Sequence, residues 1–161
     1  MAYHDDLLKQ AFDLVEKDYA NPTQADLRRA VSSAYYAVFH LLVTETTQHW
    51  SRDSSRDALG RMFEHSLMKK ASGRIFDLKH FPFVGEDPVV VGSLRTVGEL
   101  FVELQDRRHV GDYDNGKLWW TYSEALREVT TAAESFSAWQ SIKHEKIAQD
   151  YLVSLPIKPR G

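Results

Sequence analysis

Three polar side chains near the middle of the chain have types and spacing that could support chemistry: Arg108, Asp112 and Tyr113. They belong to the segment DRRHVGDYDNG, residues 106–116, which follows the apolar run VGELFVEL. Arg108 and Asp112 are four residues apart, so a helix would place both on one face. The planar guanidinium of an arginine is suited to hold a phosphate group. We therefore regard these three residues as candidate catalytic residues.

Arg108 also continues the apolar face of the helix that precedes it, which comprises Leu94, Val97, Phe101 and Leu104. An arginine on such a face needs partners, because an unpaired buried charge costs several kcal/mol or more. Asp112 is the nearest candidate partner in the sequence. Two interpretations stay open at this point. Either an Arg108–Asp112 pair locks the end of a helix, or Arg108 lies in a cleft and holds a phosphate.

A second row of polar side chains recurs at helical spacing in the segment of residues 24–50. Its members are separated by four, three and four residues, and they are Arg29, Ser33, Tyr36 and His40. Such a row on a long helix is more commonly a solvated edge than an active site, although a hydroxyl, a phenol and an imidazole in line are unusual there. We take the four residues as candidate binding residues, together with His109. A regular helix would point His109 away from the face of Arg108.

The elements that must position these residues are helices. Apolar residues recur at helical spacing along nearly the whole chain, and Pro22, the Asp87-Pro88 pair and a Thr121–Glu124 capping box mark breaks and starts. The pattern predicts an all-α, antiparallel up-and-down bundle of four to six helices, as one domain over residues 1–155 with a tail at 156–161. We expect helices over 3–18 and 24–50, a polar turn at 51–57, a helical region broken near Gly60 and Gly73, and helices over 88–112, 122–142 and 145–155.

Composition narrows the classes of function. The 161 residues are 43% hydrophobic and 27% charged, with a formal net charge of -3 and no cysteine. The absence of cysteine excludes disulfides and cysteine nucleophiles. The negative net charge gives no overall basic field that would attract DNA or RNA, so no DNA-specific readout is expected. No metal site and no cofactor are predicted, since histidines and acids do not recur at metal-ligand spacing. Without a signal peptide or a spanning segment, we expect a cytoplasmic protein with no membrane partner.

Two segments resemble the HEPN family of small helical bundles, named for higher eukaryotes and prokaryotes nucleotide-binding. The first is LRRAVSSAYYAVFHLL at 27–42, and the second is RRHVGDYD at 107–114. The second matches a family pattern of arginine, two residues, a small residue and Asp-Tyr, read here as Arg108, Gly111, Asp112 and Tyr113. The resemblance covers about residues 3–145 and implies a polar site that binds a nucleotide or RNA phosphate.

The resemblance also implies possible activities and partners for the protein. Many HEPN proteins are homodimers, and many are metal-independent ribonucleases, some of them toxins of toxin–antitoxin pairs. Their arginine is followed after four to six residues by a histidine, whereas here those positions after Arg108 hold Tyr113, Asp114 and Asn115. Other branches lack the histidine and bind nucleotides or partner a nucleotidyltransferase antitoxin. In some pairs that partner modifies a tyrosine near the motif, so the resemblance suggests Tyr113 as a target. Activity as an endoribonuclease is therefore left open.

Two alternatives stand beside the nucleotide-binding hypothesis. One is a non-catalytic dimeric module that docks a nucleotidyltransferase or another partner, and the other is a structural dimerisation bundle. A homodimer is expected because the long, broadly apolar helix at 24–50, together with Trp119, Trp120, Phe136 and Trp139, gives more apolar surface than a small bundle must bury. His65 is interpreted as a helix-surface or loop-packing residue.

Overall fold

The computed structural model describes the backbone of residues 2–75, 83–113 and 120–158, and their side chains apart from those of residues 110–113. The described residues form seven helices and contain no strand. The helices are α1 (Tyr3–Glu16), α2 (Gln24–Thr47), α3 (Asp53–Gly60), α4 (His65–Arg74), α5 (Pro88–Tyr113), α6 (Tyr122–Ile142) and α7 (Lys146–Ser154). The predicted all-α bundle is confirmed.

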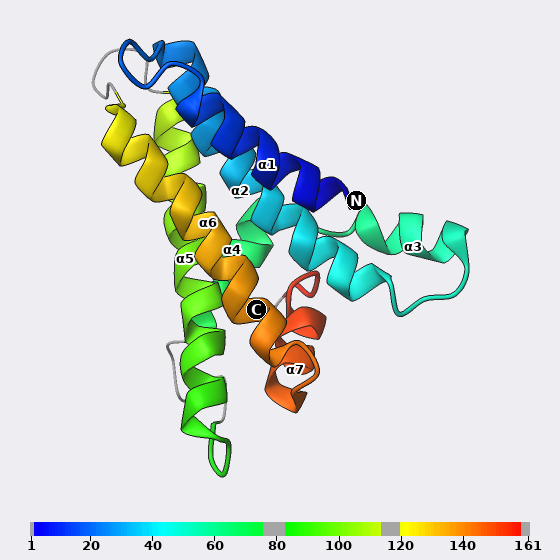
Figure 1. The fold of residues 1–161 in the computed structure, drawn as a ribbon. Helices are drawn as coiled ribbons and strands as arrows, with labels where there is room; N and C mark the ends of the chain where they lie inside the picture. Colours follow the sequence, from blue (N-terminus) through cyan, green and yellow to red (C-terminus); the bar gives the residue numbers. More distant parts are fainter. Residues whose placement is uncertain (1, 76–82, 114–119, 159–161) are drawn as a thin grey trace.

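Helix α2 is the central element of the bundle. It packs against α1, α5 and α6 along its length and against α3 and α7 near its C-terminal end. Figure 1 shows α1 and α6 running beside α2, with α5 next to α6 and α3 projecting to one side. The sequence of α2 accounts for this position, because its buried residues lie on most sides of the helix rather than on one stripe.

Local capping sets the starts of the three long helices. The Thr23 hydroxyl accepts a hydrogen bond from the Asp26 backbone N–H at 3.1 Å at the start of α2. Thr121 and Glu124 form the predicted capping box at the start of α6. The carboxylate of Asp87 accepts from the backbone N–H of residue 89 at the start of α5. These bonds satisfy N–H groups that have no partner within a helix.

The predicted turn at 51–57 is wrong in part, because α3 begins inside it at Asp53. An ion pair between Arg56 and Asp53 stabilises its first turn, and Arg56 also donates to the carbonyl oxygen of Trp50 at 2.9 Å. The predicted break near Gly60 is confirmed, since α3 ends there. The expected number of helices was four to six, and the described residues form seven because the short α3 is an additional helix. The first two helices end at Glu16 and Thr47, earlier than the predicted residues 18 and 50.

Helices α4 and α5 approach each other closely at Gly98. A Cβ atom at this position would lie 2.7 Å from Cδ1 of Ile75 and 3.0 Å from the carbonyl oxygen of Ser72. Real Cβ atoms do not come as near as 2.7 Å to another heavy atom, so a side chain at position 98 would require the end of the Ile75 side chain to move and would crowd the Ser72 carbonyl. On the far side of α4, the Ser72 hydroxyl lies 2.8 Å from the hydroxyl of buried Tyr151 on α7.

The core takes up two of the tryptophans on which the homodimer expectation rested. Trp120 is 3% exposed and Trp139 is 0% exposed within the single chain. Phe136 is half-buried, and Trp119 lies outside the described residues. The two buried tryptophans therefore add no apolar surface for a second copy. In the described part of the chain, no helix combines the length and apolar character needed to cross a membrane.

Candidate functional site

Arg108 connects the C-terminal part of α5 to the middle of α2. Its side chain is half-buried and faces α2, the direction that the apolar stripe predicts. One terminal nitrogen donates to the hydroxyl of Tyr36 at 3.1 Å. The guanidinium carbon also lies 5.0 Å from the ring centroid of Tyr35 and 5.4 Å from that of Tyr36, which is cation–π range. Two adjacent tyrosines thus hold the guanidinium in one place.

A histidine from a third helix joins this arrangement. His65 is the first residue of α4, and its Nδ1 lies 2.5 Å from the hydroxyl of Tyr35. Its ring stacks on Phe39 with centroids 4.4 Å apart and an interplanar angle of 28°. The ring of Tyr36 meets it edge-on at 5.9 Å. Helices α2, α4 and α5 therefore bring a guanidinium, two phenols and an imidazole together.

His40 lies one turn of α2 beyond Tyr36, with the two ring centroids 6.3 Å apart. The ring of Tyr3 on α1 meets His40 edge-on at 4.9 Å. We refer to Tyr35, Tyr36, His40, His65 and Arg108 as the Arg108 cluster. Two of the candidate binding residues, Tyr36 and His40, belong to it.

Burial and charge keep the imidazoles of the cluster neutral. Burial lowers the pKa of His65, and the positive charge of Arg108 lowers it further. Burial also lowers the pKa of His40, with smaller contributions from His4 and His65. The pKa of Tyr35 is raised by burial, so its phenol keeps its proton at neutral pH. The cluster consequently offers uncharged ring nitrogens beside one permanent cation.

The other candidate residues lie apart from the cluster or outside the described side chains. Arg29 is exposed on α2, and His109 is exposed on α5. Ser33 is buried, and its hydroxyl donates to Oε1 of Gln10 on α1 at 3.0 Å, so this member of the row faces α1. The side chains of Asp112 and Tyr113 lie outside the described residues. The predicted ion pair between Arg108 and Asp112 therefore lies outside them as well.

Arg107 faces a different helix from its neighbour. Its Nε lies 3.6 Å from Oε1 of Glu128 on α6, and the Glu128 side chain is almost fully buried. Burial raises the pKa of Glu128 to about 7, as does the charge of Glu103, while Arg107 and Arg127 oppose the rise. A small hollow of about 170 Å³ adjoins this pair. Adjacent arginines thus take part in two separate polar clusters.

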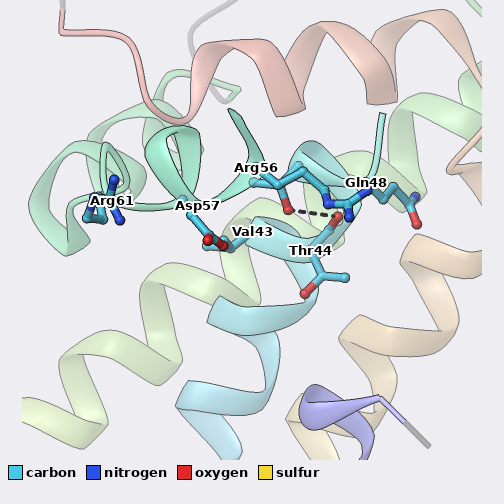
Figure 2. Close-up of a pocket in the computed structure, with 8 residues that line it drawn as sticks. Val43, Thr44, Gln48, Arg56, Asp57 and Arg61 are labelled. Atoms are coloured by element: carbon cyan, nitrogen blue, oxygen red, sulfur yellow. Dashed lines mark hydrogen bonds between the residues drawn. The ribbon is translucent and has the colours of Figure 1, made fainter. Parts of the chain in front are cut away.

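A separate hollow lies further along α2, between α2 and α3. It has a volume of about 610 Å³. Figure 2 shows its lining, which comprises Val43, Thr44, Thr47, Gln48, Arg56, Asp57, Gly60 and Arg61. A more apolar hollow of about 520 Å³ lies beside it, with Trp50, Met62 and Val153 in its wall. Neither is lined by a residue of the Arg108 cluster.

Sequence reasoning did not place His65 and Tyr35 in the Arg108 cluster. The interpretation of His65 as a helix-surface or loop-packing residue overlooks its hydrogen bond and its ring contacts. The one feature of the sequence that pointed to the cluster was the position of Tyr35 directly beside Tyr36 of the polar row. As for metals, the residues that the structure describes contain no group of three or more acidic, histidine or cysteine side chains that could hold an ion.

Comparison with known proteins adds no relative to this description. No protein-family model matches the chain, and neither a curated protein nor a solved structure matches it.

Proposed function

We propose that the Arg108 cluster binds the phosphate of a nucleotide or of RNA. The observation that carries this proposal is the guanidinium of Arg108, held between the hydroxyl of Tyr36 and two tyrosine rings beside a neutral imidazole. A guanidinium restrained in this way loses less side-chain freedom when a ligand arrives, and its fork of donors matches phosphate oxygens. The resemblance to the HEPN family supports the same ligand class.

The cluster also contains the groups needed for metal-independent cleavage of RNA. Arginine can stabilise the charge that develops on the scissile phosphate, and a neutral imidazole can accept the proton of the 2'-hydroxyl. The histidine of the family motif is absent after Arg108, but His40 and His65 bring imidazoles from two other helices. We propose that His40 or His65 takes its place, which makes ribonuclease activity the enzymatic form of this function.

The test compares the wild type with Arg108→Ala and with Arg52→Ala, which removes an exposed arginine outside the cluster. Binding of ATP and of a short single-stranded RNA is measured by calorimetry, and cleavage of the RNA is followed on a gel. Hydrogen bonds to charged groups contribute about 1.5–3 kcal/mol, so Arg108→Ala should weaken binding by about tenfold to a hundredfold. Arg52→Ala should bind as the wild type does.

Equal binding by the wild type and Arg108→Ala would refute the assignment of the site. The structural alternative predicts a different result. If Arg108 only locks α5 to α2, Arg108→Ala lowers the melting temperature markedly and leaves every binding assay unchanged. The melting temperature of both variants should therefore be measured with the binding curves.

We further propose, on the basis of the resemblance, that the protein acts in the cytoplasm as a homodimer within a toxin–antitoxin pair. In the non-catalytic form of this proposal, the protein docks a nucleotidyltransferase antitoxin, and Tyr113 is the residue modified. Sedimentation that shows only monomer at micromolar concentration would contradict the homodimer. Transfer of a nucleotidyl group to the wild type but not to Tyr113→Phe would support the docking form.

A further inference from the structure

The hydroxyl of Tyr35 has a defined hydrogen-bonding direction. Tyr35 is 0% exposed, so no solvent serves its hydroxyl. Among the described residues, Nδ1 of His65 is the one group within hydrogen-bond distance of that hydroxyl, at 2.5 Å. A buried phenol that keeps its proton must donate it to the available acceptor. Tyr35 therefore donates to Nδ1, and the neutral ring of His65 carries its own proton on Nε2.

The opposite nitrogen of His65 is accessible to a ligand. Nε2 makes no hydrogen bond to a described residue. Seven polar side-chain atoms of the described residues are both buried and unpaired, and Nε2 is not among them, so it reaches the surface. The ring lies close enough to Arg108 for the guanidinium charge to act on it. The groups recorded against the ring are Tyr35, Tyr36 and Phe39 from α2 and Arg108 from α5, and of these only Arg108 is charged at neutral pH.

We infer that Tyr35 is a positioning residue that holds His65 as a neutral Nε2–H donor, and that this donor and Arg108 contact the same phosphate. The contact with phosphate rests on the proposed function, whereas the state of the ring does not. An imidazole held in this tautomer cannot accept a proton at Nε2. In RNA cleavage the acceptor is therefore His40, whose ring nitrogens have no partner among the described residues and are not buried.

The first experiment tests the state of the ring without any ligand. Nitrogen NMR of the histidine side chains in the wild type should show His65 protonated on Nε2 and not on Nδ1 at neutral pH. Tyr35→Phe removes the hydroxyl alone, so His65 should become a mixture of tautomers and its titration midpoint should rise. Tyr19→Phe, at an exposed tyrosine, should change neither signal. A proton on Nδ1 of His65 in the wild type would overturn the inference.

The second experiment tests the contact with phosphate, using ATP as the probe. His65→Ala should weaken ATP binding by about tenfold to a hundredfold, the effect of one hydrogen bond to a charged phosphate. His65→Gln places an amide N–H near the position of Nε2 and should restore part of the loss. If the wild type binds ATP and His65→Ala binds it equally well, the donor assignment is overturned and the proposed function stands. If the wild type binds no ATP or RNA, both are overturned.

Discussion

Replacing the buried Glu128 with glutamine should raise the free energy of unfolding above neutral pH and leave it nearly unchanged in acid. Glu128 is only 2% exposed, and its Oε2 atom has no hydrogen-bond partner within the described part of the chain. Burial raises its pKa from 4.5 to about 7, with the charge of Glu103 acting in the same direction. Glutamine has the shape of the protonated carboxyl group and carries no charge, so the substitution isolates the cost of ionisation.

The sign and size of the effect follow from the two pKa values. Between pH 4.5 and about 7, the folded state keeps a proton that the unfolded state releases, so the free energy of unfolding falls as the pH rises through this window. A pKa that moves from 4.5 to about 7 corresponds to roughly 3 kcal/mol once the pH exceeds 7. The attraction of half-exposed Arg107 is already contained in that pKa, because it opposes the rise that burial causes.

Denaturant unfolding of the wild type and Glu128→Gln at pH 4, 6 and 8 measures the difference directly. We expect about 0 kcal/mol at pH 4 and a gain of about 3 kcal/mol for the variant at pH 8. Glu134→Gln, at an exposed position of the same helix, should match the wild type at every pH. A Glu128→Gln variant that is less stable than the wild type at pH 8 would mean that the pair with Arg107 outweighs the burial of charge.

Two further substitutions test hydrogen bonds between residues that are far apart in the sequence. The side-chain amide of Gln24 donates to the backbone carbonyl oxygen of Trp120 at 2.7 Å and accepts from the backbone N–H of Trp120 at 3.0 Å. Gln24→Ala should therefore lower the free energy of unfolding by about 1–3 kcal/mol, measured by chemical denaturation. Tyr151→Phe leaves the fully buried hydroxyl of Ser72 without its 2.8 Å partner and should also cost about 1–3 kcal/mol, seen as a lower melting temperature.

Each of these predictions has a matched control. Gln140→Ala, at an exposed glutamine, should be neutral, and an equal loss in Gln140→Ala and Gln24→Ala would show that the bonds to Trp120 contribute nothing. For Tyr151→Phe, adding Ser72→Ala should recover part of the stability because no buried hydroxyl is then left unpaired. A double variant that loses the two single costs in full would contradict that explanation.

The helices were predictable wherever their signals are local. The capping box at Thr121 and the Asp87-Pro88 start act within a few residues of each helix end. Helix α3 escaped prediction because none of its residues is buried, so its sequence carries no apolar face. An exposed helix that is stabilised by charges at its own start looks like a polar turn when only the residue pattern is available.

For the candidate site, the sequence predicted which face of its own helix a residue occupies, but not which other helix that face contacts. Helical spacing placed Arg108 on the inner face of α5 and Tyr36 on the polar row of α2. It could not decide which neighbouring helix that row meets, and Ser33 faces α1 instead. His65 escaped because its contact with Tyr35 joins residues thirty positions apart, through the bend between α3 and α4. Spacing along one helix carries no information about a partner on another.

The close crossing at Gly98 has a consequence for how the cluster could be altered. Helix α4 carries His65 and α5 carries Arg108, and the two helices meet where a side chain at Gly98 would strike Ile75 and Ser72. The crossing lies ten residues from Arg108, about 15 Å along α5, and close to the opposite end of α4 from His65. A larger residue at position 98 would require the end of the Ile75 side chain to move and would crowd the Ser72 carbonyl, so the two helices that present His65 and Arg108 are coupled through a residue outside the cluster.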